Sequence, residues 1–160
     1  MLNKTVILFV AAGLTASSGV SHAQTETEQE VKQTIIDGYE YVNTNLVSRA
    51  QDYSRHGALE FWSSGGLSNE IPSGDVEEYD AFNIQPKHIK VITLVEGQAA
   101  VAHYYAEGSM KPKGSSAVDN YLVRATQVYV KEDGAWKIRS SHYSAIIGGL
   151  GTSQTAREKP

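Results

Sequence analysis

The chain has 160 residues, no cysteine, and 18 acidic against 14 basic residues. Disulfides are therefore excluded. The acidic balance argues against a nucleic-acid partner, which requires a basic surface, and against adhesion to anionic lipid. The length suits one domain, large enough to bury an adequate core without covalent staples.

The first residues have the pattern of a secretory signal peptide. A basic start, Met-Leu-Asn-Lys, is followed by the apolar run Thr5–Ala16 and by Ser21-His22-Ala23, a small-x-Ala cleavage site. The apolar run is short for a membrane span. We predict cleavage near Ala23, with residues 1–23 as the signal peptide, and a periplasmic or secreted protein with no membrane anchor in its mature form. An uncleaved anchor is the alternative.

Residues 25–50 predict one long amphipathic helix. Their apolar residues recur at helical spacing, and Thr27-x-x-Glu30 has the capping-box pattern. The polar stretch 49–56 favours a second short helix. A third is predicted from residue 75 to residue 82, where Asp75-x-x-Glu78 is a capping pattern.

The second half of the chain predicts an antiparallel sheet. Residues 88–95 and 99–107 form one hairpin, and residues 121–131 and 136–144 form another. The turn of the second hairpin is Glu132-Asp133-Gly134, for which we expect a three-residue loop with the glycine at positive φ.

Helices followed by an antiparallel meander predict an α+β fold. We expect the domain to span residues 24–147 and a flexible tail to span residues 148–160, which are rich in glycine at their start and charged at their end.

Unbroken alternation places one mixed set of side chains on a single face of the second hairpin. Trp136 and Ile138 make this face apolar near the turn, and Arg124 and His142 make its far end polar. Thr126, Val128, Val130 and Ser140 complete the face. We interpret it as the inner face, with a pocket mouth at the polar end and a packed floor below.

The same hairpin carries a family resemblance. Arg124-x-Thr126, Asp133-Gly134-x-Trp136-Lys137-Ile138 and His142-x-Ser144 resemble the C-terminal half of SnoaL-like domains, in the nuclear-transport-factor-2-like superfamily. The resemblance implies a cone in which N-terminal helices pack on a curved antiparallel sheet around a pocket, and it implies a homodimer. The superfamily includes isomerases, dehydratases, epoxide hydrolases, polyketide cyclases and members without catalysis, so the fold does not select a function.

Two residues are the strongest candidates for the predicted pocket. Arg124 suits an anion clamp, because its planar guanidinium matches a carboxylate. The alternative is a structural pair with Asp119 or Glu107. His142 is a candidate general acid or base, although a hydrogen-bonded histidine at a strand end is the favoured alternative.

Tyr105 is the candidate catalytic partner of His142, and the predicted ligand-binding set is completed by Thr126, Trp62, His103 and Ser140. Relatives that resemble ketosteroid isomerase need a carboxylate on the inner sheet face, and the predicted inner faces carry no Asp or Glu in mid-strand. A histidine–tyrosine pair, as in scytalone-dehydratase-like relatives, is the chemistry least contradicted. No metal-ligand spacing and no cofactor motif is present.

Three functions remain open from the sequence. The first is a small-molecule-binding protein whose ligand is partly apolar or anionic. The second is a lyase or isomerase that uses the histidine–tyrosine pair. The third is a dimeric interaction module with a vestigial pocket, for which exposed apolar residues on the outer sheet face are the expected sign.

Overall fold

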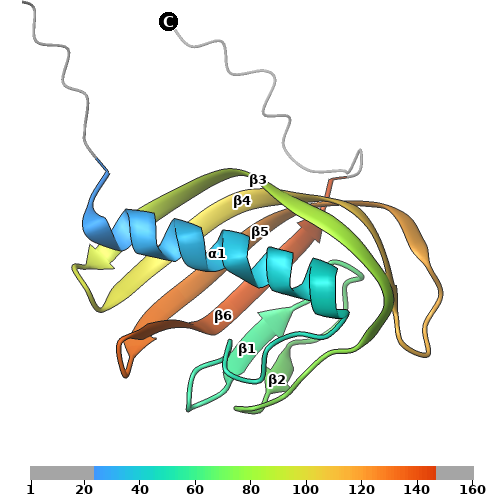
Figure 1. The fold of residues 1–160 in the computed structure, drawn as a ribbon, viewed down its shortest axis with the longest axis horizontal. Helices are drawn as coiled ribbons and strands as arrows, with labels where there is room; N and C mark the ends of the chain where they lie inside the picture. Colours follow the sequence, from blue (N-terminus) through green and yellow to red (C-terminus); the bar gives the residue numbers. More distant parts are fainter. Residues whose placement is uncertain (1–23, 147–160) are drawn as a thin grey trace, which may run out of the picture.

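The computed structural model describes residues 24–146. The predicted signal peptide, residues 1–23, and the predicted tail, residues 148–160, lie outside them. Across the described residues, a single helix packs on a single sheet (Figure 1). The elements are α1 (Glu26–Asn45), β1 (Ala58–Phe61), β2 (Asn69–Ile71), β3 (Tyr79–Val95), β4 (Ala99–Pro112), β5 (Val118–Glu132) and β6 (Ala135–Ala145).

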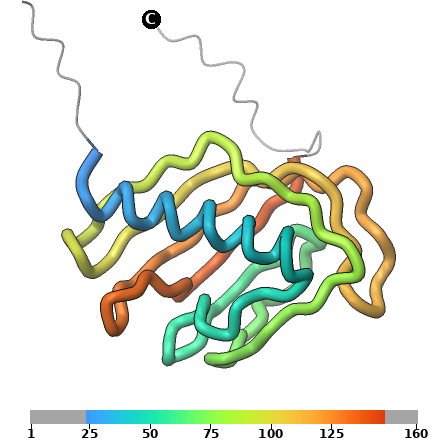
Figure 2. The backbone as a smooth tube through the Cα atoms, viewed as in Figure 1, coloured from blue at the N-terminus to red at the C-terminus, as the bar shows by residue number. Residues whose placement is uncertain are grey.

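The six strands form a single sheet in the order β2-β1-β6-β5-β4-β3. Neighbours are antiparallel except β1 and β6, which run parallel. The sheet curves around the helix, which crosses its concave face, as the backbone trace shows (Figure 2). This is the α+β cone that the sequence predicts. Within residues 24–146, no helix has the length and apolar character that a membrane span requires.

The N-terminus of α1 is fastened to the turn between β3 and β4. Thr25, not Thr27, is the N-cap, and it forms a capping box with Glu28. Thr27 is buried instead: its hydroxyl donates to Glu96 Oε1 at 2.8 Å and accepts from the Gly97 amide at 2.8 Å. The capping box therefore lies two residues before the predicted Thr27-x-x-Glu30 pattern, and Thr27 anchors the helix to the sheet.

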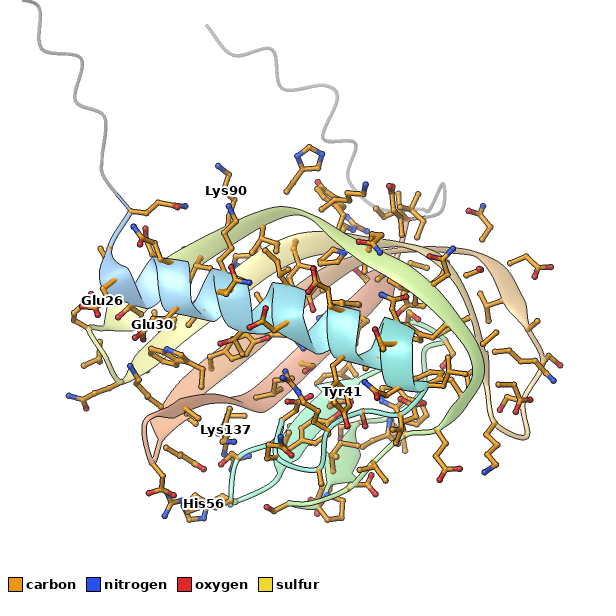
Figure 3. The ribbon with its side chains drawn as sticks, in the orientation of Figure 1. Glu26, Glu30, Tyr41, His56, Lys90 and Lys137 are labelled. Atoms are coloured by element: carbon orange, nitrogen blue, oxygen red, sulfur yellow. The ribbon has the colours of Figure 1, made fainter. Side chains whose placement is uncertain are left out.

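A second anchor joins α1 to the β5–β6 hairpin. Glu30, which lies on α1 (Figure 3), accepts from Lys131 Nζ at 2.6 Å and from Trp136 Nε1 at 2.7 Å. These two hydrogen bonds lower the pKa of Glu30. The core lies between the helix and the concave face. Its buried residues are Val31, Ile35, Ile84, Ala100, Ala102, Tyr104, Ala106, Val123, Ala125, Tyr129 and Trp136.

Two predicted short helices are absent from the described residues. Residues 49–56 form turns, held by isolated bridges from Val47 to Glu78 and from Tyr53 to Ile138. Residues 79–82 begin β3, because they pair with residues 110–112 of β4. Ladder pairing over 17 residues outweighs a local capping pattern.

The β5–β6 hairpin differs from its prediction at the turn. The loop has two residues, Asp133 and Gly134, and both have positive φ, 50° and 80°. Two left-handed residues are typical of a type I′ turn, which matches the twist of the flanking strands. The predicted three-residue loop is therefore wrong, although Gly134 has the expected positive φ.

A β-bulge in β6 overturns the predicted face. Val128 pairs with Ser140 but Tyr129 pairs with Ile138, so Arg139 is an extra residue. An extra residue inverts the alternation beyond it. The two-residue turn places Trp136 and Ile138 on the inner face with Tyr129, and the extra residue then places Ser140 on the outer face.

Candidate functional site

The inner face of the sheet carries a buried polar network centred on Gln127. Tyr104 and Tyr129 donate to its Oε1 at 2.8 and 2.7 Å. Its Nε2 donates to Tyr143 at 2.8 Å and to Ser141 Oγ at 3.4 Å. The carboxamide is thus fully hydrogen-bonded beneath α1, as a buried polar group must be.

Next to this network lies a buried carboxylate, Glu60. In β1, Ala58 and Glu60 point inward while Leu59 and Phe61 are exposed. Glu60 is 5% exposed and is the register partner of Ser141 in the parallel pairing with β6. The strand that adds to the sheet by parallel pairing therefore brings an acid to the inner face.

Burial is the main cause that raises the pKa of Glu60, because an apolar surrounding disfavours the charged form. Hydrogen bonds from Ser141, Trp62 and Tyr53 act in the opposite direction, and the nearby charge of Glu77 raises the pKa further. The best defined of these bonds runs from Trp62 Nε1 to Glu60 Oε2 at 3.2 Å. No lysine or arginine among residues 24–146 forms an ion pair with Glu60.

Tyrosines surround the carboxylate. Burial raises the pKa of Tyr53 and of Tyr121, which keeps both phenols protonated at neutral pH. Tyr79 donates to Glu77 at 2.7 Å, and Tyr39 lies 3.3 Å, hydroxyl to hydroxyl, from Tyr104. The site therefore offers phenol donors around one acid whose pKa is raised above that of an exposed glutamate.

A second acid lies nearby. Asp52 accepts from Arg49 Nε at 2.8 Å, and both side chains are largely covered. Burial raises the pKa of Asp52, against the lowering effect of Arg49. Asp52 thus has its own cation, whereas Glu60 forms no ion pair with any of the residues that the structure describes.

Most of the site residues predicted from the sequence lie elsewhere. Arg124 and His142 are exposed, on the outer face. There the His142 ring contacts the Phe61 ring, with 5.7 Å between centroids. Arg124 has no ion pair among residues 24–146, with either Asp119 or Glu107, and Glu107 pairs with Lys87 at 3.4 Å instead. The prediction that this face is the inner one is wrong.

The remaining predicted residues follow the same division. His103 Nδ1 lies 3.0 Å from Thr126 Oγ1, and Ser140 Oγ donates to the carbonyl of Leu59 at 3.0 Å. Tyr105 is exposed. These contacts belong to the outer face, and the ligand-binding and catalytic roles assigned to these residues stay predictions. Only Trp62 reaches the Glu60 site.

Glu60 is a candidate functional residue that sequence reasoning missed. In the sequence, Glu60 is indicated only by its charge within the otherwise apolar residues 59–62. In a strand, alternation places Ala58 and Glu60 on one face and Leu59 and Phe61 on the other. On hydrophobicity alone, the face with Leu59 and Phe61 would be assigned to the core. Pairing of β1 with β6 reverses that choice.

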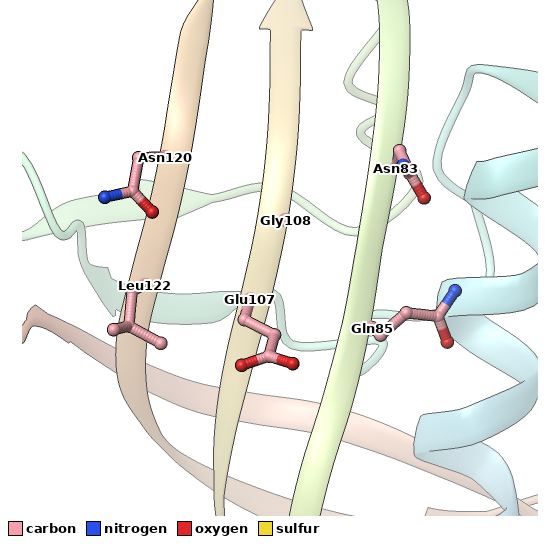
Figure 4. A pocket seen from close by; sticks show the side chains of 6 residues that line it. All are labelled: Asn83, Gln85, Glu107, Gly108, Asn120 and Leu122. Atoms are coloured by element: carbon pink, nitrogen blue, oxygen red, sulfur yellow. The ribbon is translucent and has the colours of Figure 1, made fainter.

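Two open hollows lie elsewhere on the surface. One, of about 360 Å³, is lined by polar side chains of β3, β4 and β5. In Figure 4 the amide of Gln85 points away from the Glu107 carboxylate, so these two polar groups do not converge on one ligand position. The other, of about 500 Å³, lies at the β5–β6 turn and includes Arg55, which already pairs with Asp133 at 2.8 Å.

Comparison with known families agrees with this architecture. A profile of the SnoaL-like domain matches residues 55–148, which include β1, the Glu60 site and the bulged hairpin. The chain belongs to the SnoaL-like domain family. Its fold is that of the nuclear-transport-factor-2-like superfamily, as the sequence resemblance predicts.

Solved structures share this fold at low sequence identity. A nuclear-transport-factor-2-like protein of unknown function from Pseudomonas putida KT2440 is 18% identical, with 84% of this chain and 96% of that chain covered and a TM-score of 0.54. An uncharacterised protein with a cystatin-like fold from Caulobacter vibrioides is 15% identical, with 76% and 92% covered and a TM-score of 0.54.

A third is a putative Ca/calmodulin-dependent kinase II association domain from Exiguobacterium sibiricum 255-15. It is 11% identical, with 79% and 98% covered and a TM-score of 0.55. The search of curated proteins found no match. At these identities, the similarity shows that the fold is shared and does not show that the chemistry is shared.

Proposed function

We propose that this SnoaL-like domain binds a small neutral or cationic molecule on its inner face, with Glu60 as the central contact. The observation that supports this most is an acid that is 5% exposed and has no cationic partner among the described residues. An uncompensated buried carboxylate is costly for folding. Perturbed acids of this kind concentrate at functional sites.

The chemistry of the site favours a ligand that carries a hydrogen-bond donor. An ionised carboxylate only accepts hydrogen bonds, and the Trp62 indole now donates to it. A ligand hydroxyl, amide or ammonium group would take the place of the indole, while tyrosine rings supply apolar contact. Glu77 adds negative charge nearby, which disfavours an anion. The anionic ligand predicted for Arg124 would concern the outer face and remains a separate prediction.

Access to Glu60 runs past Trp62. The indole is 47% exposed and follows directly after β1. Gly65 and Gly66, which come next in the loop, have positive φ, and a Cβ added to either would meet nothing within 4 Å. A loop with so few contacts can move at low cost, so we expect ligand entry by displacement of Trp62.

A lyase or isomerase activity would use the same acid. The histidine–tyrosine pair predicted from the sequence lies on the outer face, whereas Glu60 and Tyr53 lie together on the inner face. Proton transfer between a ligand carbon and Glu60, with a tyrosine hydroxyl as donor to the ligand, is the reaction type this arrangement supports.

A thermal-shift screen of small alcohols, amides and amines with the wild type and Glu60→Gln tests this proposal. We expect at least one compound to raise the melting temperature of the wild type but not of Glu60→Gln. Glu70→Gln is the matched control, because Glu70 is an exposed glutamate on the neighbouring strand β2. Compounds that stabilise wild type and Glu60→Gln equally would refute a role for Glu60.

A second candidate function is self-association through the outer face. On this face, exposed apolar side chains lie toward both edges of the sheet. They are Leu59 and Phe61 on β1 and Ile92 and Leu94 on β3. The row from Leu59 to Ile92 is continuous across five strands by register. Such a surface favours a protein partner, and a second copy of this chain is the occupant we propose.

Sedimentation of the wild type and of Ile92→Lys checks the second candidate. A dimer that becomes a monomer in Ile92→Lys supports it, and Lys87→Ala is the control at a polar position of the same strand. A wild type that stays monomeric at high concentration would exclude it. Export after cleavage near Ala23 also remains a proposal, which N-terminal sequencing of the purified protein tests.

A further inference from the structure

Gln127 and Glu60 are connected through Ser141. Gln127 is 3% exposed and Ser141 is 1% exposed, so water does not compete for their polar atoms. Gln127 Nε2 lies 3.4 Å from Ser141 Oγ, and Ser141 is the register partner of Glu60, whose pKa the Ser141 hydroxyl lowers. The three side chains come from adjacent strands β5, β6 and β1, at paired register positions.

The direction of these hydrogen bonds follows from the chemistry of the groups. The hydroxyls of Tyr104 and Tyr129 occupy Gln127 Oε1, which places the amide nitrogen toward Ser141 and Tyr143. An amide nitrogen only donates, so the oxygen of Ser141 must accept. The hydrogen of Ser141 is then free to point at Glu60, whose ionised form only accepts.

We propose that Gln127 is a positioning residue that directs the Ser141 hydroxyl hydrogen to the Glu60 carboxylate. The inference rests on the proposed function, in which Glu60 is the central group of the site. Its consequence is that Gln127, with no contact to a ligand, sets how readily Glu60 gives up its proton. Without the amide, the Ser141 hydroxyl can turn and accept a hydrogen bond from protonated Glu60.

Other titratable groups also face Glu60 and must be held constant. They are Tyr39 on α1, Tyr53 in the following loop, Glu77 before β3, Tyr121 on β5 and Tyr143 on β6. Gln127 bears no charge, so its replacement by an uncharged side chain changes none of these groups in kind. A change in the proton affinity of Glu60 can then be assigned to the Gln127–Ser141 connection.

The indole N–H resonance of Trp62 reports the ionisation of Glu60, because that N–H donates to the carboxylate. We would follow it by ¹⁵N NMR during a pH titration, assign it with Trp62→Phe, and identify the Glu60 transition by its loss in Glu60→Gln. Loss of one hydrogen bond to a charged group corresponds to about one pH unit. In Gln127→Met we therefore expect the midpoint to rise by about one unit.

Two comparisons separate this role from a general packing role. Tyr129→Phe removes another partner of Gln127 and should leave the midpoint in place. In a Ser141→Ala background, Gln127→Met should cause no further shift. If Gln127→Met does not fold, Gln127→Asn tests the same point. The shorter side chain keeps a carboxamide but moves its nitrogen away from Ser141.

An unchanged midpoint in the Gln127 variant, or an equal shift with and without Ser141, overturns the inference. The titration needs no ligand, so its failure is distinct from a failure of the proposed binding function. A screen without hits would leave the NMR result standing, and an unshifted midpoint would leave ligand binding by Glu60 intact.

Discussion

Trp62 covers Glu60: its indole N–H donates to Glu60 Oε2 at 3.2 Å, and the indole is half exposed while the carboxylate is buried. Trp62 is one of the ligand-binding residues predicted from the sequence, whereas Glu60 was not predicted. The Trp62 side chain, on a glycine-containing loop, separates the Glu60 carboxylate from water. Trp62 therefore closes the inner face over Glu60.

Glu60→Gln should stabilise the protein at neutral pH. Burial raises the pKa of Glu60 in the folded state. Below the unfolded-state pKa both states are protonated and there is no penalty; as pH rises through the folded-state pKa, stability is lost. The variant avoids this loss, so we expect a gain on the order of 1 kcal/mol at neutral pH that disappears in acid.

Urea denaturation of both proteins at several pH values measures this difference. Glu70→Gln, on an exposed glutamate, should follow the wild type at every pH. A Glu60→Gln advantage that is the same in acid and at neutral pH would show that the charge of Glu60 is not its cause.

Arg124→Ala and His142→Ala should leave the inner face unaffected. Both side chains are exposed on the outer face, so each substitution should change the free energy of unfolding by no more than about 0.5 kcal/mol. Compounds that stabilise the wild type through Glu60 should stabilise both variants to the same extent in thermal-shift measurements. A selective loss of binding in His142→Ala would return the site to the face predicted from the sequence.

Thr27→Val should destabilise the contact of α1 with the β3–β4 turn. The isosteric substitution leaves the Gly97 amide without its acceptor and removes one of the two hydrogen bonds that Thr27 donates to Glu96. A buried group that loses its hydrogen bond costs about 1–3 kcal/mol. Chemical denaturation measures the change, with Thr44→Val on the exposed side of the same helix as the control. Equal effects of the two variants would mean that valine weakens the helix wherever it is placed.

Gly108→Ala should be among the most damaging single substitutions. Gly108 has φ 148°, and a Cβ there would lie 1.9 Å from the carbonyl oxygen of Asn83 on β3. The backbone of one strand would have to move, at a cost of about 3 kcal/mol or more. Gly97→Ala is the matched control, since its φ is 66° with open space around it, and we expect about 1–2 kcal/mol. Thermal unfolding that ranks Gly97→Ala as the worse variant would contradict this reasoning.

The sequence by itself determined the elements with strong local signals. The helix predicted over residues 25–50 contains α1, and both hairpin turns occur where they were predicted, although the β5–β6 loop has two residues instead of three. The family resemblance rests on the same hairpin, and the family and the α+β cone are confirmed. Short capping patterns predicted less well, because residues 79–82 pair with β4 instead of forming a helix.

Only the tertiary structure decided which side chains face inward. Strand side chains alternate with a period of two, so the single extra residue at Arg139 inverts every position beyond it. That inversion moved Ser140 and His142 outward and left Trp136 inside. The parallel docking of β1 on β6 then chose Glu60 over Phe61 for the interior. Neither event has a local signal, because a bulge and a strand partner are set by the packing of the whole sheet.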